Sequence, residues 1–80
     1  MSHQRIVLYG KPGCHLCDDA RLVVERVCAE TGASYTEVDI TTDPALMKAF
    51  GDQIPVTFVD GEQHDFWRVD EARLRSALGH

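Results

Sequence analysis

The sequence has few cysteines, no long hydrophobic run and no excess of positive charge, and each shortage excludes a class of protein. Its 80 residues include three cysteines, an odd number at low density that does not fit the disulfide framework of a small secreted domain. No stretch approaches the roughly 18 apolar residues of a membrane span. The apolar segment after residues 1–5 is too short for the core of a signal peptide. We therefore expect a cytoplasmic protein with no membrane partner.

Basic residues are outnumbered by acidic ones. Eight Lys and Arg stand against thirteen Asp and Glu, so the net charge is −5, the wrong sign for a module that binds nucleic acid by neutralising phosphates. Hydrophobic residues make up 44% and charged residues 26%, which is ordinary globular usage and excludes a disordered chain. A chain of this length buries one core. We expect a single domain over residues 1–80 that is a monomer.

The first half of the chain alternates strand and helix signals. Residues 5–9 form a β-rich run that stops at Gly10 and predict a buried strand. From Cys14 to Cys28 apolar residues recur at helical spacing while charged residues fill the opposite face, which predicts a helix. Gly32 is typical of the end of such a helix.

The middle of the chain predicts an edge strand and a short helix. Residues 35–40 alternate polar and apolar side chains, the pattern of a strand near the edge of a sheet. Asp43 is a good N-cap, and Pro44 suits the first position of a helix. We expect this helix over residues 45–50, with Gly51 at its end.

The last third predicts a hairpin and a final helix. A strand over residues 56–59 is followed by Asp60-Gly61, a strong two-residue hairpin turn, and by a second strand over residues 62–68. Asp70 caps the last helix. The opening strand, helix and strand require a parallel pair with a right-handed crossover, and the hairpin adds antiparallel strands. The predicted fold is α/β, a mixed four-stranded sheet flanked by three helices.

The feature that carries chemistry is Cys14-His15-Leu16-Cys17, between the first strand and the first helix. Positions i and i+3 of a first helical turn share one face, which brings two sulfurs within disulfide reach. The helix N-terminus offers free N–H groups and a positive dipole, so it favours a thiolate at Cys14, the candidate nucleophile. Cys17 lies one turn further on the inward face, which suits the thiol that resolves a mixed disulfide.

Two other interpretations of this motif remain open. A zinc site normally needs four ligands, and the sequence has no second pair of this kind. The remaining candidate ligands lie at no recognised spacing: His3, His64, His80 and Cys28. A structural disulfide is unusual in a cytosolic domain that has its own core. We interpret the pair as redox-active, with no metal and no organic cofactor, and keep metal or cluster binding and a structural disulfide as the alternatives.

Segments spread over nearly the whole chain carry a family resemblance. They are Lys11, Pro12-Gly13-Cys14-His15-Leu16-Cys17, Val38-Asp39-Ile40, Ile54-Pro55-Val56 and Asp60-Gly61. Together they resemble the glutaredoxin branch of the thioredoxin superfamily, and most closely its small members with a Gly-Cys-His-Leu-Cys site. The resemblance implies a thioredoxin-like fold of order βαβαββα and catalysis by Cys14 and Cys17. It also implies a cis Ile54-Pro55 bond beside the active disulfide.

The resemblance further implies how a substrate is held, and here the chain departs from the family. Lys11, Ile54 and Pro55 stand where glutaredoxins bind the substrate. His15-Leu16 replaces the usual Pro-Tyr between the cysteines. Only Gly61 stands where the family often carries Gly-Gly followed by an Asp that holds the glutamyl group of glutathione.

These observations lead to a functional hypothesis with rivals from other classes. We expect a dithiol oxidoreductase that reduces protein disulfides through Cys14 and Cys17. Glutathione or a thioredoxin-reductase-type flavoprotein would then re-reduce the pair. The rival is a module in which Cys14, with glutathione or a second chain, holds an iron–sulfur cluster. A third possibility is an interaction domain whose dithiol is incidental.

Other candidate residues have simpler interpretations. Cys28 shares the inward helix face and is expected to be a small buried apolar residue. Asp39 is expected to cap the loop that follows its strand. Phe66 and Trp67 cannot both face the core of one strand, and we expect one of them to cap the last helix. His64 is expected on the surface.

Overall fold

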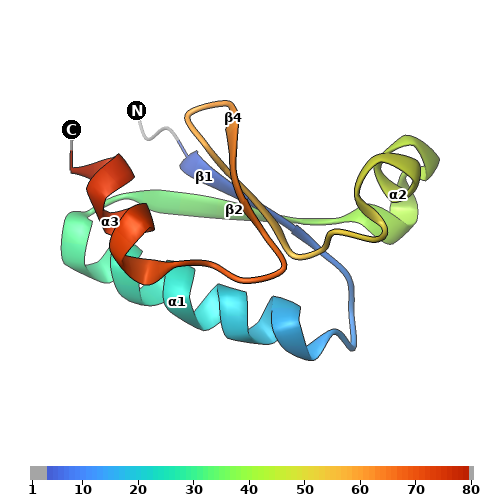
Figure 1. Cartoon of the computed structure of the whole chain (residues 1–80), viewed down its shortest axis with the longest axis horizontal. Helices are drawn as coiled ribbons and strands as arrows, with labels where there is room; N and C mark the ends of the chain where they lie inside the picture. Colours follow the sequence, from blue (N-terminus) through green and yellow to red (C-terminus); the bar gives the residue numbers. More distant parts are fainter. Residues whose placement is uncertain (1–3, 80) are drawn as a thin grey trace.

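The computed structural model describes residues 4–79, without the side chain of Gln4, and its centre is a four-stranded sheet (Figure 1). The strand order is β2-β1-β3-β4. The strands are β1 (Gln4–Gly10), β2 (Ser34–Asp39), β3 (Val56–Val59) and β4 (Glu62–Phe66). β1 and β2 are parallel, whereas β3 is antiparallel to both β1 and β4. The predicted mixed sheet is therefore confirmed, with β2 at an edge.

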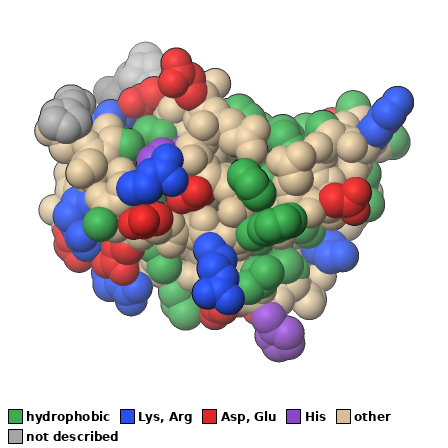
Figure 2. Space-filling view, viewed as in Figure 1, with side chains coloured by type: hydrophobic (Ala, Val, Ile, Leu, Met, Phe, Trp, Pro, Cys, Tyr) green, Lys and Arg blue, Asp and Glu red, His purple; other side chains and the backbone are tan. Residues whose placement is uncertain are grey.

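Three helices flank the sheet, as predicted. They are α1 (His15–Thr31), α2 (Pro44–Phe50) and α3 (Glu71–Leu78), and a short 3₁₀ turn, η1 (Ile40–Thr42), precedes α2. α1 and α3 lie along one face of the sheet, and α2 lies beyond one end of it (Figure 1). In the same view, Figure 2 shows that hydrophobic side chains gather over the first turns of α1 and the end of β4. Among residues 4–79 no helix has the length and hydrophobicity needed to cross a bilayer.

The predicted boundary residues set most of the element ends. The Asp43 carboxylate accepts hydrogen bonds from the Ala45 and Leu46 N–H groups at the start of α2. Asp70 caps α3 in the same way. Gly32 ends α1 in the left-handed conformation, which glycine adopts without steric cost. Asp60 and Gly61 have φ angles of 53° and 86°, the two positive values of a type I′ hairpin turn.

The end of β4 differs from the prediction. The strand stops at Phe66 rather than at residue 68, because Trp67 has a φ of 63° and leaves the ladder. Its backbone N–H donates to the carbonyl oxygens of Gln53 and Pro55, at 3.1 and 2.8 Å. The expectation that one ring caps α3 is also wrong. Both rings are exposed, and the indole N–H of Trp67 donates to the Asp52 carbonyl oxygen at 2.9 Å.

The core divides into two clusters. The larger fills the space between the sheet and the α1–α3 layer, and its buried members are Ile6, Val24, Val27, Val59, Leu74 and Leu78. The smaller consists of Cys17, Ile40 and Ile54, with Cys14 and Tyr9 among the residues packed against it. The second thiol is therefore part of the apolar packing where β1 ends.

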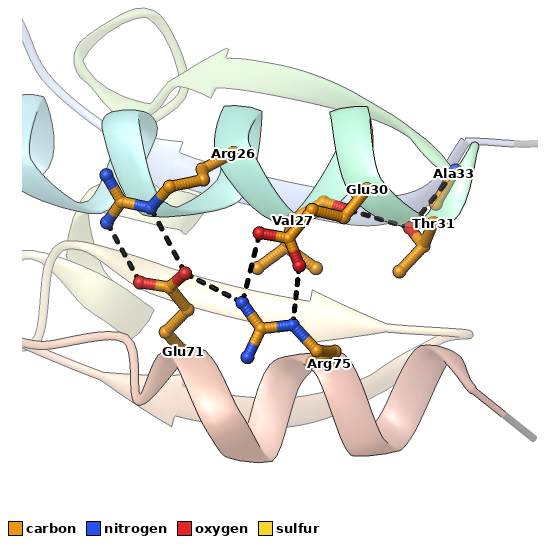
Figure 3. Close-up of polar contacts among 7 residues, drawn as sticks. All are labelled: Arg26, Val27, Glu30, Thr31, Ala33, Glu71 and Arg75. Carbon is orange, nitrogen blue, oxygen red and sulfur yellow. Dashed lines mark hydrogen bonds and ion pairs between the residues drawn. The ribbon is translucent and has the colours of Figure 1, made fainter.

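Ion pairs on the surface connect α1 to α3 (Figure 3). Arg26 of α1 contacts Glu71 of α3 at 2.9 Å, and Arg75 of α3 contacts Glu30 of α1 at 2.7 Å. Arg75 also contacts Glu71 at 2.8 Å, which joins the two pairs into one network. Single exposed pairs contribute little to stability, but a network holds its members in a shared geometry.

This network predicts a pH dependence of stability. The hydrogen bonds and the charge of Arg26, followed by those of Arg75, hold the pKa of Glu71 below its ordinary value of 4.5. A carboxyl with a lowered pKa in the folded state stabilises the protein above its unfolded pKa, and this stability is lost as the pH falls through the folded pKa. We expect Glu71→Gln to have a lower Tm than the native chain at neutral pH, and the two Tm values to converge in acid.

Thermal unfolding followed by circular dichroism across that range makes the test. Glu62→Gln, at an exposed glutamate of β4, is the matched control and is expected to follow the native chain at every pH. A difference between Glu71→Gln and the native chain that stays constant down to the lowest pH would contradict the prediction.

Candidate active site

The two cysteines of the motif lie where β1 passes into α1. After Gly10 the chain makes a short exposed loop, and Gly13 has a φ of 76°, a conformation that a residue with a side chain rarely adopts. Cys14 follows as the N-cap residue of α1. The loop thus delivers Cys14 to the end of the helix where unpaired N–H groups point outward.

The sulfur of Cys14 accepts a hydrogen bond from the helix that it caps. The backbone N–H of Cys17 donates to Cys14 Sγ at 3.2 Å. Both residues are free thiols in this structure, Cys14 partly buried and Cys17 fully buried. An N–H donor aimed at a sulfur binds it more strongly when the sulfur is ionised. Accessibility and this bond single out Cys14 as the sulfur that can meet an external disulfide.

Cys17 has the opposite environment. Burial raises the pKa of the Cys17 thiol to about 11, and its hydrogen bond with Cys14 adds to the effect. At neutral pH Cys17 is therefore a protonated thiol in the reduced protein. The two sulfurs therefore differ in burial and in hydrogen bonding before any substrate binds.

Gly10 leaves the space that the Cys17 sulfur occupies. A Cβ atom at position 10 would lie 2.9 Å from Cys17 Sγ and 3.3 Å from Cys17 Cβ, closer than packed atoms tolerate. The sequence marked Gly10 only as the end of a strand. The residue is also required for the first turn of α1 to pack directly on β1.

Ile54 and Pro55 form the next part of the site. Their peptide bond is cis, as the resemblance implied, and both residues are buried. Ile54 shares the smaller core cluster with Cys17. The Pro55 carbonyl oxygen accepts the N–H of Trp67, so this turn contacts the cysteine cluster on one side and the end of β4 on the other.

Lys11 is exposed and lies in a shallow hollow of about 370 Å³ that also includes Arg21, Glu37 and Asp39. Arg21 is paired with Glu37 at 2.7 Å. Asp39 caps η1, as predicted, by accepting a hydrogen bond from the Thr41 N–H at 2.9 Å. The hydrogen bonds from Thr41, led by that of its hydroxyl, lower the pKa of Asp39. Asp39 is exposed, and its carboxylate accepts hydrogen bonds from Thr41 of the following loop rather than from either cysteine.

A second hollow lies between the first turns of α1 and the segment after β4. This groove has a volume of about 220 Å³, and its lining residues are Leu16, Asp19, Ala20, Val23, Trp67, Arg68 and Val69. We refer to it as the Trp67 groove. Sequence reasoning missed it, although the adjacent aromatics Phe66 and Trp67 signalled that one ring is exposed.

The Asp60-Gly61 turn does not lie at the site, contrary to the expectation from the resemblance. Asp60 is bound to Arg5, at the start of β1, by an ion pair of 2.9 Å, whereas Cys14 follows the other end of that strand. Seven strand residues separate the two ends by about 20 Å. Because β3 runs antiparallel to β1, its last residue, Val59, pairs with Ile6 near the start of β1. The segment that returns to Pro55 is the one after β4.

The remaining metal candidates are scattered. Within residues 4–79 no group of three His, Cys, Asp or Glu side chains is arranged to hold a metal. Cys28 is partly buried against the larger core cluster, and burial raises the pKa of its thiol. His64 is partly buried rather than on the surface, and its ring Nε2 finds no partner among the described residues. His3 and His80 lie outside the described residues.

Comparison with known proteins identifies the family. The model of the glutaredoxin-like domain (DUF836) matches residues 5–79. The chain belongs to the glutaredoxin-like domain family. An uncharacterized protein of Mycobacterium tuberculosis is 33% identical over 98% of this chain and 86% of its own length.

Solved structures agree with this assignment. A structural-genomics target from X. campestris has a TM-score of 0.77 at 35% identity, over 92% of this chain and 95% of its own. A mutant thioredoxin from Halobacterium salinarum has a TM-score of 0.63 at 28% identity, over 91% of this chain and 69% of its own. The thioredoxin-like fold of this glutaredoxin-like domain is confirmed, and fold and family together support a thiol redox role.

The packing of Gly10 predicts the effect of adding one methyl group. Gly10→Ala is expected to destabilise the reduced protein by about 1–3 kcal/mol, the usual cost of overpacking a core. In a Cys17→Ala background, where the clashing sulfur is gone, the same change should cost much less. Urea unfolding under reducing conditions of the four proteins in this double-mutant cycle measures the difference. An equal cost in both backgrounds would show that the sulfur is not what Gly10 accommodates.

Proposed function

We propose that this glutaredoxin-like domain is a thiol–disulfide oxidoreductase that reduces protein disulfides through Cys14 and Cys17. The observation that carries the proposal is the 3.2 Å hydrogen bond from the Cys17 N–H to Cys14 Sγ. It aligns an accessible sulfur with a helix N-terminus, one turn from a buried and protonated thiol. We assign the domain to the cytoplasm, where such thiols are kept reduced, and propose that it acts as a monomer.

The reaction divides into two exchanges. The Cys14 thiolate attacks one sulfur of the substrate disulfide, a new S–S bond forms to Cys14, and the other substrate sulfur leaves as a thiolate that takes up a proton. Cys17 then loses its proton, and its sulfur attacks Cys14 Sγ. The Cys14–Cys17 bond forms, and the remaining substrate sulfur leaves and is protonated. The substrate disulfide gains two electrons, and the cysteine pair loses the same two electrons as it becomes a disulfide.

The buried position of Cys17 gives the order of these steps a physical reason. A thiol with a pKa of about 11 offers little thiolate to a disulfide in solution. Once a substrate sulfur is joined to Cys14, Cys17 faces an electrophile within its own turn of helix, and the reaction becomes intramolecular. Proximity then offsets the low thiolate fraction.

Substrate binding is assigned to three residues. Lys11 is exposed beside the cysteine loop, where its ammonium attracts a carboxylate of the substrate or donor. We assign to the backbone of Ile54 and Pro55 the pairing with an extended segment of the partner, as in strand addition. Glutathione or a thioredoxin-reductase-type flavoprotein then returns the two electrons to the disulfide.

The surface around the cysteines supports a protein substrate over a small charged thiol. Leu16, Phe66 and Trp67 are 40%, 48% and 54% exposed. Large apolar side chains gathered beside a reactive group are typical of a surface that contacts another protein. Cluster binding, the alternative, needs thiolates from outside this chain in addition to Cys14, and absorption in the visible range by freshly isolated protein would reveal it.

The two thiols predict different variant phenotypes. Cys17→Ser is expected to accumulate a mixed disulfide between Cys14 and a disulfide-bonded test protein, because the resolving sulfur is missing. Cys14→Ser is expected to lose reductase activity while its unfolding curve stays close to that of the native chain, since Cys14 is only partly buried. Mass spectrometry identifies the adduct. Cys28→Ser is the control and should retain full turnover. Undiminished activity of Cys14→Ser would refute the mechanism.

Glutathione is expected to be a poor reductant. The family holds the glutamyl group with a Gly-Gly corner followed by an Asp, and the segment that lies beside Pro55 here, residues 66–69 after β4, contains no glycine and carries the large ring of Trp67. Losing one charge-assisted hydrogen bond costs about 1.5–3 kcal/mol, or roughly a tenfold to hundredfold loss of affinity. A glutathione-coupled assay should therefore give a KM at least about tenfold above that of a standard glutaredoxin run in parallel. A KM equal to that of the standard would contradict this prediction and show that the domain uses glutathione as an ordinary glutaredoxin does.

A further inference from the structure

Trp67 has a backbone conformation that the exchange chemistry does not explain. Its φ of 63° lies in the left-handed region, which is an outlier for a bulky side chain. Three hydrogen bonds hold it there, from its backbone N–H to Gln53 and Pro55 and from its indole N–H to Asp52. The ring is nevertheless 54% exposed. A conformation this unfavourable, held by three hydrogen bonds to residues 52–55, is a reason to look for a function of the ring that it positions.

The ring forms one wall of the Trp67 groove. Five of the seven lining residues are apolar, and the two charged ones, Asp19 and Arg68, have opposite signs. A volume of about 220 Å³ is below the range of roughly 300–1,000 Å³ typical of small-molecule sites. The volume therefore suits a single side chain of a partner rather than a whole cofactor, and the ring of Trp67 with the aliphatic residues of α1 favours an apolar one.

The groove is also within reach of a substrate joined to Cys14. Leu16, which lies between the two cysteines in the sequence, is part of its lining. From Leu16 to Val23 the helix rises about 10 Å. An extended peptide advances roughly 3.3 Å per residue, so a side chain within about three residues of the substrate cysteine can enter the groove.

We propose that Trp67 determines substrate specificity, by forming a wall that accepts one apolar side chain flanking the reacting cysteine of a protein substrate. The inference rests on the proposed function and adds the substrate class: disulfides with a large aliphatic or aromatic residue within about three positions of the cysteine. The occupant contacts the ring in the mixed disulfide, after the Cys14–substrate bond has formed and before Cys17 breaks it.

The test compares two peptide disulfides that differ only next to the cysteine. One carries leucine at the three positions on each side of the cysteine, and the other carries serine at the same positions. The native chain is expected to have a kcat/KM about tenfold higher for the leucine peptide. This ratio corresponds to about 1.4 kcal/mol, the burial of roughly half of a leucine side chain.

Variants separate the ring from general effects on folding. Trp67→Ala is expected to reduce the leucine preference to about twofold or less, because the wall is missing. Val23→Ala, in the opposite wall, should also lower the preference without changing the backbone of Trp67. Leu22→Ala removes a large apolar side chain that is 60% exposed and does not line the groove. This control should keep the tenfold ratio.

Each outcome decides one question. A native chain that reduces neither peptide would contradict the proposed function itself. A native chain that reduces both peptides equally would overturn the specificity inference and leave the function standing. The specificity inference is also overturned if folded Trp67→Ala and Val23→Ala both keep the native ratio, or if Leu22→Ala loses it to the same extent.

Discussion

The contact between Gly10 and the sulfur of Cys17 is the constraint on which the rest of the site depends. Because residue 10 has no side chain, the first turn of α1 packs directly against the end of β1, with Cys17 Sγ in the space a Cβ would fill. This packing buries Cys17 and raises the pKa of its thiol. It also leaves Cys14, three residues earlier, at the rim of the same cluster, where its sulfur accepts the Cys17 N–H. The absence of a side chain at position 10 is therefore one condition for the unequal environments of the two thiols.

The other segments of the site contact this pair of residues directly or through the sheet. Ile54 packs beside Cys17 in the smaller core cluster, and the Pro55 carbonyl oxygen holds Trp67 where β4 ends. The larger cluster and the Arg26–Glu71–Arg75–Glu30 network hold α1 against α3. This packing presents the partly exposed sulfur of Cys14, and Leu16, two residues further on, lines the Trp67 groove. The proposed polypeptide substrate would meet both the sulfur and the groove.

Local signals made much of the fold predictable, and long-range contacts account for what was missed. The caps at Asp43 and Asp70, the left-handed end at Gly32 and the Asp60-Gly61 turn are each set by a few neighbouring residues, and each was predicted. The position of that turn relative to Cys14 depends on the direction of β3 in the sheet, so the expectation drawn from the family resemblance misplaced it. The backbone of Trp67 is fixed by Asp52, Gln53 and Pro55, more than ten residues away. No residue close to Trp67 in the sequence predicts this backbone conformation.

The unequal environments of Cys14 and Cys17 are the centre of this account, and alkylation of the reduced, folded protein tests them most directly. The rate of iodoacetamide labelling is measured separately at each cysteine, by peptide mapping, from neutral pH upward. We expect Cys14 to be labelled first at neutral pH, and Cys17 to be labelled appreciably only as the pH approaches about 11. Labelling of Cys17 at neutral pH as fast as that of Cys14 would contradict the account.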